Sequence, residues 1–265
     1  MNKFKKLIKA IGLLLKQPSL INLIVEYDEN YHTLVTRKYG IETGLKKINF
    51  DEFLQLEDTL DQYSFLDGGS IVTDYLLLKA LSKKLNRPDC FEIGTWRGES
   101  ALSMAKYANK VFTLNLSKEE LLSLGFSEEY ANLQGVLCNR ADNITQLWGN
   151  TFTYDFSPYK NKFDLIFVDG DHKYKSVVND TKIAVQIMKN KNSVIVWHDY
   201  GFGTETTRWE VLLGILEGLP KEMHRHLYSV NNTLCAIYYP FPVESKLMSY
   251  PQSPDKLYKI KISKE

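Results

Sequence analysis

The chain has 265 residues, a hydrophobic fraction of 44% and a formal net charge of +1 at pH 7. A chain of this length and composition can bury one sizeable core and carry an extension. The charge shows no basic excess of the kind that nucleic-acid-binding proteins use against phosphates. We therefore expect a small molecule or a glycan as the substrate, and no nucleic acid as a partner.

The chain opens on a basic amphipathic segment. Four lysines between residues 3 and 9 alternate with apolar residues that continue to Leu15. The segment is too short and too charged to span a bilayer and lacks a small-residue cleavage site, so we expect no export signal. Two roles stay open: peripheral contact with an anionic membrane surface, or packing on the parent domain or on a homodimer partner. Packing is the more frequent role of such a stripe.

The three cysteines lie far apart in the sequence. Cys90, Cys138 and Cys235 fall in or near apolar runs, without the spacing of a metal site. This usage is typical of reduced, buried thiols, and we expect a cytoplasmic protein.

The most informative stretch is C-F-E-I-G-T-W-R-G-E-S, which runs from Cys90 to Ser100. It predicts a buried strand, a turn with two glycines and then a helix. Gly94 and Gly98 would let a ligand lie against the main chain near the helix start, and Glu92 adds a fixed acceptor. The spacing E-x-G-x-x-x-G differs from the G-x-G-x-x-G of dinucleotide binders and disfavours a nicotinamide enzyme.

Three further apolar runs end in polar residues. They lie at residues 111–116, 163–172 and 193–200, and their polar ends include Asn115, Asp169 and His198-Asp199. Between the last two runs the periodicity predicts a helix with Asp171 as its N-cap. Alternating strands and helices form a doubly wound sheet, whose ligands lie outside the carboxyl ends of the strands.

Taken together and in this order, these motifs resemble the class I S-adenosylmethionine-dependent methyltransferases. The resemblance runs from about Phe65 to Pro240 and is nearest to a small bacterial branch that includes the macrocin-type sugar O-methyltransferases. It implies a Rossmann-like α/β fold, with a seven-stranded, mostly parallel sheet, the last strand antiparallel and helices on both faces. Residues 226–230 and 233–239, joined by Asn231-Asn232, fit that antiparallel pair.

The resemblance also implies a domain organisation. We expect an N-terminal helical extension at residues 1–64, with a further helix from Val72 to Leu85 after it. The methyltransferase domain would occupy residues 65–242, and a C-terminal tail residues 243–265.

S-adenosylmethionine is the cofactor that the resemblance implies. The residues implied to bind it are Glu92, Gly94, Thr95, Trp96, Gly98, Asn115, Asn150, Thr151 and Asp169. Asn115 and Asn150 stand where relatives usually carry Asp, at the ribose and the adenine. Since neutral acceptors form weaker hydrogen bonds than ionised ones, each replacement is expected to cost about 1 kcal/mol of binding free energy.

Methyl transfer to oxygen needs an in-line approach and removal of the acceptor's proton. His172, three residues after Asp169, is the predicted general base, and the family places a histidine at this offset. Relatives also bind magnesium through acidic residues at these strand ends, so Asp169 and Asp199, with the neighbouring His198, are the predicted ligands of a Mg²⁺ ion. The third oxygen ligand of those relatives is missing, so the requirement for a metal stays open.

These observations predict an S-adenosylmethionine-dependent O-methyltransferase that acts on a hydroxyl of a sugar, a glycan or a small metabolite. Two alternatives remain. One is a nonenzymatic binding protein that keeps the pocket without turnover, and the other is a nicotinamide oxidoreductase.

Trp96, Trp148 and Trp197 lie at strand ends, where core packing is favoured over stacking on a ligand.

Overall fold

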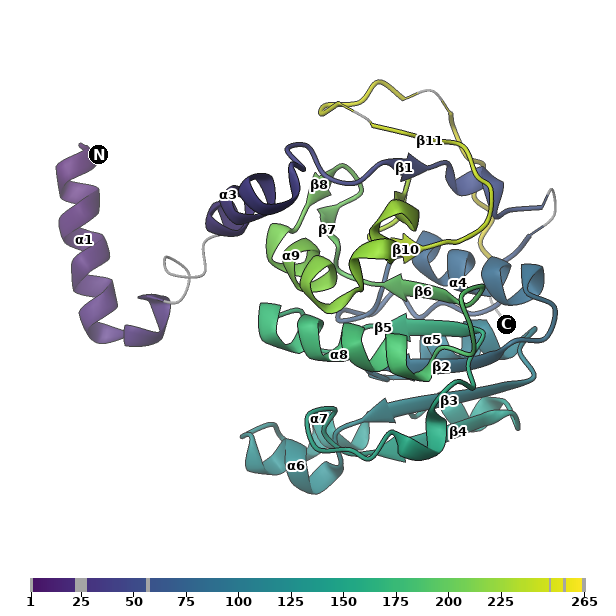
Figure 1. The fold of residues 1–265 in the computed structure, drawn as a ribbon. Helices are drawn as coiled ribbons and strands as arrows, with labels where there is room; N and C mark the ends of the chain where they lie inside the picture. Colours follow the sequence, from purple (N-terminus) through teal and green to yellow (C-terminus); the bar gives the residue numbers. More distant parts are fainter. Residues whose placement is uncertain (1, 22–27, 56–57, 248, 255, 264–265) are drawn as a thin grey trace.

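A nine-stranded sheet forms the centre of the computed structural model (Figure 1). The structure describes residues 2–21, 28–55, 58–247, 249–254 and 256–263. The strand order is β11-β1-β9-β10-β6-β5-β2-β3-β4. The bounds are β1 (Lys47–Ile48), β2 (Asp89–Ile93), β3 (Lys110–Asn115), β4 (Ile144–Trp148), β5 (Leu165–Val168), β6 (Val194–Trp197), β9 (Leu227–Val230), β10 (Ala236–Tyr238) and β11 (Ser245–Lys246).

The sheet has the predicted doubly wound arrangement. Strands β4, β3, β2, β5 and β6 are parallel, whereas β10 is antiparallel to both β6 and β9. The last residues of the parallel strands align, since Ile93 pairs with Leu114 and Val168, and Val168 pairs with Trp197. The residues that follow these strands therefore meet at one edge of the sheet.

Two strands of two residues each extend the predicted set of seven. β1 pairs with β9, and β11 pairs with β1. A strand of two residues has no hydrophobic period that sequence analysis could detect. Both come from segments expected to flank the methyltransferase domain, whose boundaries stay a prediction.

Helices cover both faces of the sheet, as predicted (Figure 1). One face carries α3 (Asp28–Tyr39), α8 (Tyr174–Ile187) and α9 (Trp209–Gly218), and the other carries α4 (Val72–Lys84) and α5 (Glu99–Ala105). The remaining helices are α1 (Lys3–Lys16), α6 (Lys118–Ser123), α7 (Glu128–Asn132), η1 (Pro18–Ile21), η2 (Phe50–Glu52), η3 (Cys138–Arg140), η4 (Ser157–Tyr159) and η5 (Lys221–His226). A small hairpin, β7 (Gly201–Gly203) and β8 (Thr206–Thr207), precedes α9.

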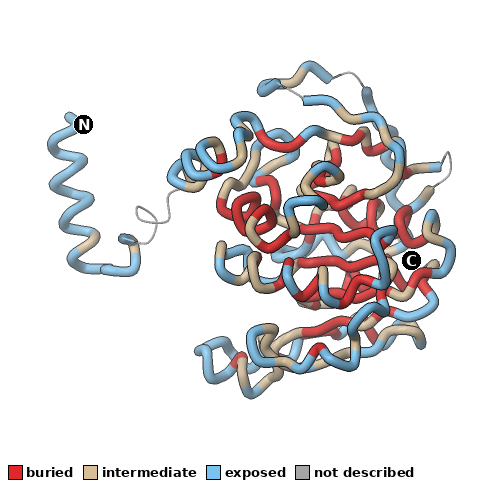
Figure 2. The backbone as a smooth tube through the Cα atoms, viewed as in Figure 1, coloured by how far each residue is buried: buried red, intermediate tan, exposed pale blue. Residues whose placement is uncertain are grey.

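The core consists of two apolar layers, one on each face of the sheet (Figure 2). All four residues of β5 are buried. Leu165 and Phe167 belong to the layer beneath α4 and α5, while Ile166 and Val168 belong to the layer beneath α8 and α9. This alternation explains the continuous apolar runs in the sequence, because a central parallel strand is buried on both faces. Cys90, Cys138 and Cys235 are free and buried, as predicted.

The helix after β5 begins later than the sequence predicts. Its N-cap is Lys173, not Asp171. The carboxylate of Asp171 instead accepts the backbone N–H of Lys173 at 3.2 Å and the hydroxyl of Ser176 at 2.8 Å. The first N–H of α8, from Tyr174, donates to Glu210 of α9 at 3.0 Å. A side chain from another helix therefore takes part of the capping role.

The C-terminal hairpin and α4 agree with their predictions. β9 and β10 pair through the turn at Asn231-Asn232, where Asn232 has a φ of 61°. A left-handed φ is one that asparagine tolerates better than most residues. α4 covers Val72–Lys84, one residue shorter than the predicted helix.

The N-terminal helix α1 lies apart from the sheet (Figures 1 and 2). None of its residues is buried. Within the described residues, α1 therefore does not bury its apolar side chains against the parent domain. No helix in the described ranges is long and apolar enough to cross a bilayer.

Candidate functional site

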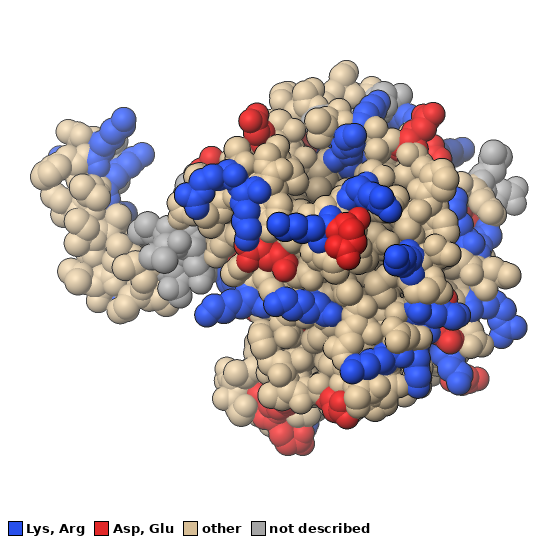
Figure 3. All heavy atoms as spheres, in the orientation of Figure 1, with Lys and Arg blue, Asp and Glu red and all other residues tan. Residues whose placement is uncertain are grey.

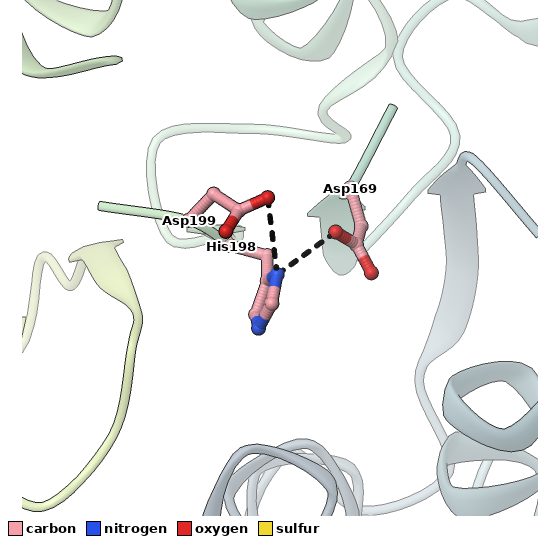
Figure 4. Close-up of side chains that lie close together, drawn as sticks. All are labelled: Asp169, His198 and Asp199. Carbon is pink, nitrogen blue, oxygen red and sulfur yellow. Dashed lines mark ion pairs between the residues drawn. The ribbon is translucent and has the colours of Figure 1, made fainter. Parts of the chain in front are cut away.

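Three strand ends meet at the carboxyl edge of the sheet. Asp169 follows β5, His198 and Asp199 follow β6, and Gly94 follows β2. Backbone hydrogen bonds hold these ends together, because Asp169 N–H donates to Ile93 at 2.8 Å and His198 N–H donates to Val168 at 3.0 Å. Figure 4 shows the resulting cluster, in which the His198 ring lies between the two aspartates. The sequence predicted this convergence.

His198 is surrounded by carboxylates. Its Nδ1 lies 3.0 Å from Asp169 Oδ1 and 3.7 Å from Asp199 Oδ2, and its Nε2 lies 3.1 Å from Asp74 Oδ2. Burial alone would lower the pKa of His198, but the three carboxylates outweigh it and raise the pKa well above the usual 6.5. In the protonated form that these carboxylates favour, both ring N–H groups of His198 can donate.

Asp74 is a member of the cluster that sequence analysis missed. It lies in the first turn of α4 and is fully buried. Its carboxylate accepts the backbone N–H of Ile71 at 3.0 Å and that of Leu234 at 2.8 Å, in addition to the contact with His198. Asp74 thus ties the start of α4 and the loop before β10 to the site. An aspartate in a first turn looks like an ordinary helix-start residue, so no sequence pattern marks Asp74 as part of a site.

The pKa values of the two other carboxylates shift in opposite directions. Burial raises the pKa of Asp169, and His198 opposes that rise only in part. Burial would also raise the pKa of Asp199, but the hydrogen bond and charge of His198 and the guanidinium of Arg208 outweigh it and lower that pKa. Arg208 Nη1 lies 3.3 Å from Asp199 Oδ1. Asp199 is therefore ionised at neutral pH.

His172 lies at the exposed side of the cluster. Its side chain is 49% exposed, against 8% for His198, and its Nδ1 lies 3.7 Å from Asp199 Oδ2. The structure thus brings the predicted base to the same carboxylate that contacts His198. Only the exposed ring of these two can meet a ligand from solvent without displacing a carboxylate.

The donor set fits a divalent cation. One ligand atom each from Asp169, His198 and Asp199 lies within 4.8 Å of the others. His198 could ligate through Nδ1 once that nitrogen loses its proton, while Nε2–H continues to donate to Asp74. A carboxylate behind a histidine ligand is a common arrangement around protein metals. Two carboxylates and one imidazole suit several divalent ions, and which ion would bind stays open.

The glycine turn after β2 is shaped by close packing. Gly94 has a φ of +92°, and a Cβ built on it would lie 2.0 Å from the carbonyl oxygen of Asp169. Gly98 also has a φ of +92°, and its Cβ would lie 2.6 Å from Cys138 Sγ. Both glycines are thus required by the protein itself, in addition to their predicted role toward a ligand.

Glu92 and Thr95 belong to a buried polar network. Glu92 is fully buried, and its carboxylate accepts hydrogen bonds from the hydroxyls of Ser100 and Thr113. Burial raises the pKa of Glu92 to about 8, although those hydroxyls oppose the rise. Thr95 Oγ1 lies 2.6 Å from Thr113 Oγ1. The network fixes the turn, and direct contact of Glu92 or Thr95 with a cofactor stays a prediction.

The residues predicted at the ribose and the adenine have protein partners. Asn115, at the end of β3, donates through Nδ2 to Gln134. Asn150 Oδ1 accepts the backbone N–H of Phe152 at 3.0 Å, which closes a local turn. Thr151 Oγ1 accepts a hydrogen bond at 3.2 Å from an asparagine of α8. The side-chain oxygen of Asn150 is therefore already engaged, and the roles of these residues toward a cofactor stay predictions.

The tryptophans at the strand ends have different environments. Trp197 is a core residue, 1% exposed, and its Nε1 donates to Thr181 at 2.9 Å. Trp148 is 46% exposed. Trp96 lies against Tyr130 with a centroid distance of 4.6 Å. Its buried Nε1 has no hydrogen-bond partner among the described residues. An exposed ring and an unpaired N–H donor are groups that a ligand with a flat base and polar acceptors could contact.

A cavity of about 580 Å³ lies away from the cluster. It is lined mainly by residues 60–64, by α5 and by residues near η3, and it contains none of the residues in Figure 4. The cluster itself borders a hollow of about 10 Å³ that Asp169, His172, His198 and Asp199 share with Trp197. The large cavity and the cluster of ionisable residues therefore lie in different places. The cluster is the candidate site because its side chains have the predicted chemistry.

A family comparison matches the part of the chain that builds the site. Residues 91–200 match a family model described as a methyltransferase domain. The matched range contains the glycine turn and the strand-end residues Asp169, His172, His198 and Asp199, whereas Asp74 lies outside it. The more specific resemblance to the macrocin-type branch stays a prediction.

Three individual proteins show low sequence identity to the chain. The uncharacterized protein R132 of Acanthamoeba polyphaga mimivirus is 29% identical over 142 residues, 50% of this chain and 62% of that protein, so the match spans less than two thirds of this relative. An O-methyltransferase from Bacillus cereus, solved in complex with SAH, is 17% identical with a TM-score of 0.45, covering 79% of this chain and 97% of that chain. The O-methyltransferase TomG from Streptomyces achromogenes, in complex with SAM, is 16% identical with a TM-score of 0.45, covering 64% and 81%. Neither structural likeness is close enough to assign a ligand.

Proposed function

We propose that the chain is an S-adenosylmethionine-dependent methyltransferase that methylates a hydroxyl of a sugar, a glycan or another small molecule. The observation that carries the proposal is a coincidence of two findings. The range that matches a methyltransferase domain, residues 91–200, contains the predicted base and both strand-end acids, which lie together at one edge of the sheet.

The residues at this edge suit the chemical groups of the cofactor. S-adenosylmethionine carries a positively charged sulfonium, and Asp169 and Asp199 provide negative charge near the glycine turn. The unpaired Nε1 of Trp96 offers a donor for an acceptor group, and the exposed ring of Trp148 offers a surface for a base. When bound, the cofactor would supply the electrophilic methyl group.

His172 is the residue that would take the acceptor's proton. Ionised Asp199 lies 3.7 Å from its Nδ1 and favours the tautomer with the proton on that nitrogen. Nε2 then carries the lone pair that can accept a proton from a hydroxyl. Asp199 acts here through His172, so its role is to orient the base.

A divalent cation such as Mg²⁺ is a second way to activate the hydroxyl. The convergence of Asp169, His198 and Asp199 favours this route. A bound cation would lower the pKa of the acceptor hydroxyl and orient it. The two routes make different predictions for a chelator.

The proposal is tested by transfer of a labelled methyl group from S-adenosylmethionine to a panel of hydroxylated sugars and phenols. We expect His172→Gln to lower turnover by roughly 10²–10⁴ while the affinity for S-adenosylhomocysteine stays unchanged, because the imidazole acts on the acceptor. His226→Gln is the matched control, since His226 precedes β9 at the opposite edge of the sheet.

The outcomes separate the routes. Activity that is lost with chelator and restored by Mg²⁺ assigns the metal route. Full activity of His172→Gln contradicts the assignment of the base. Failure of every acceptor, together with no binding of S-adenosylhomocysteine, contradicts the proposed function.

A further inference from the structure

Helix α1 has two chemically opposite faces. At 100° per residue, an apolar stripe follows the spacing i, i+3, i+4, i+7 and a lysine stripe lies opposite. The apolar stripe contains Phe4, Leu7, Ile8, Ile11, Leu14 and Leu15, and the opposite face carries Lys5, Lys9 and Lys16. Such a pattern normally buries its apolar face against something.

The apolar face of α1 has no partner among the described residues. No residue of α1 is buried, and Phe4 and Leu15 are 66% and 79% exposed. Figure 1 shows the helix set apart from the sheet and its covering helices. The apolar stripe is therefore available to something other than the described part of this chain.

The charge of α1 indicates what covers this face. The helix contains five lysines and no acidic residue, and the first acidic residue of the chain is Glu26. On the face visible in Figure 3, α1 shows basic but no acidic side chains. A second copy of α1 would cover the apolar stripe but would offer no acidic side chain to the five lysines. An anionic lipid surface instead complements both stripes, with headgroups for the lysines and acyl chains for the apolar residues.

We propose that α1 is a peripheral membrane anchor that lies in the interface of an anionic bilayer. Its 14 residues span about 21 Å, less than the roughly 30 Å of a bilayer core, so the helix lies along the surface. The apolar stripe enters the boundary between headgroups and acyl chains, and the lysines remain at the phosphates. This binding is independent of methyl transfer.

Vesicle flotation of the full chain tests the proposal. The vesicles contain phosphatidylcholine alone or phosphatidylcholine with phosphatidylserine. We expect flotation with the anionic vesicles at about 0.1 M salt and a loss at about 1 M, because the Debye length falls from roughly 10 to 3 Å. Neutral vesicles should retain much less protein.

Variants of the two faces provide the controls. We expect Lys5→Glu/Lys9→Glu/Lys16→Glu to lower vesicle partitioning at least about tenfold, and Ile8→Asp/Ile11→Asp to abolish it. Neither variant should alter the melting temperature, because α1 has no buried residue. The matched control Lys160→Glu/Lys162→Glu/Lys221→Glu makes the same charge change at exposed positions outside α1 and should still float.

Three results would overturn the anchor. The first is no flotation of the wild type with anionic vesicles at low salt. The second is equal loss in the α1 charge variant and its control. The third is a wild-type dimer, seen by light scattering, that does not bind vesicles and that Ile8→Asp/Ile11→Asp dissociates. This result would assign the apolar face to a second copy. None of these results bears on the proposed methyl transfer.

Discussion

Among single residues, Asp180 is a buried carboxylate whose ionisation opposes folding. It lies in α8, is 2% exposed and accepts a hydrogen bond from Asn179 Nδ2 at 3.1 Å. Burial raises its pKa from 3.8 to about 6, although the side chains of Thr151 and Asn179 lower it in part. The folded protein therefore binds a proton more tightly than the unfolded chain between about pH 4 and pH 6.

Asp180→Asn should remove this pH dependence. Because the folded pKa is raised, the carboxyl favours folding below pH 4, and the wild type loses this contribution as pH rises to 6. The stability of the variant relative to wild type should thus increase by roughly 2 kcal/mol between pH 4 and pH 7, from a pKa shift of about two units. Urea unfolding of both proteins across this range measures the difference. A constant difference would contradict the assignment.

Gly94 offers a second test at a single residue. Gly94→Ala places a Cβ 2.0 Å from the Asp169 carbonyl at a φ of +92°, whereas Gly125→Ala has nearly the same φ of +90° and no heavy atom within 4 Å. The strained φ alone costs about 1–3 kcal/mol in each variant. Any additional loss of unfolding free energy in Gly94→Ala therefore measures the clash of the new Cβ with the Asp169 carbonyl. Equal losses of stability in thermal unfolding would show that the backbone at Asp169 moves away from residue 94 at little cost.

The sequence predicted most of the candidate site but missed Asp74. Asp169, His198 and Asp199 follow recognisable strands, so their meeting at one edge follows from the parallel register. Asp74 contacts His198 across 124 residues of sequence. Its location depends on how α4 packs against the end of β6, which no local pattern encodes.

At the level of elements, three helix starts are linked by side chains. Asp28 of α3 accepts the backbone N–H groups of Trp209 at 3.0 Å and Glu210 at 2.9 Å, the first two residues of α9. Glu210 in turn accepts the N–H of Tyr174 at the start of α8. Unpaired N–H groups at helix starts are thereby satisfied from a neighbouring helix.

Asp28→Ala should therefore destabilise the packing of α3 and α9. Removal of a capping carboxylate costs about 0.5–2 kcal/mol, and Asp28 accepts two N–H groups at once, so we expect a loss near the upper end. Asp28→Asn keeps one acceptor and should cost less. Asp142→Ala removes an exposed carboxylate and serves as the control in denaturant unfolding. A loss in Asp28→Ala no larger than in the control would show that water replaces these bonds freely.

These links also explain which elements the sequence could predict. The long parallel strands, α4 and the β9–β10 hairpin have strong periods or turn residues. The N-cap of α8 was predicted to be Asp171 and is Lys173, because Glu210 supplies an acceptor from a distant part of the chain. β1 and β11 have two residues each and depend on pairing alone.

At the scale of the molecule, the sheet carries a cluster in which one histidine contacts three carboxylates. Helix α1 lies apart from the sheet (Figure 1) and has lysines and an exposed apolar stripe. The parallel sheet was predictable because its motifs recur in a fixed order. The placement of α1 was not, since an amphipathic stripe specifies a buried face without specifying what buries it.

The most direct test of the proposed function is calorimetry of the full chain with S-adenosylmethionine, S-adenosylhomocysteine and NAD in separate titrations. A methyltransferase predicts saturable heat with the first two ligands and none with NAD, because the glycine turn lacks the dinucleotide spacing. Saturable binding of NAD, or no binding of either sulfur compound, would contradict the account.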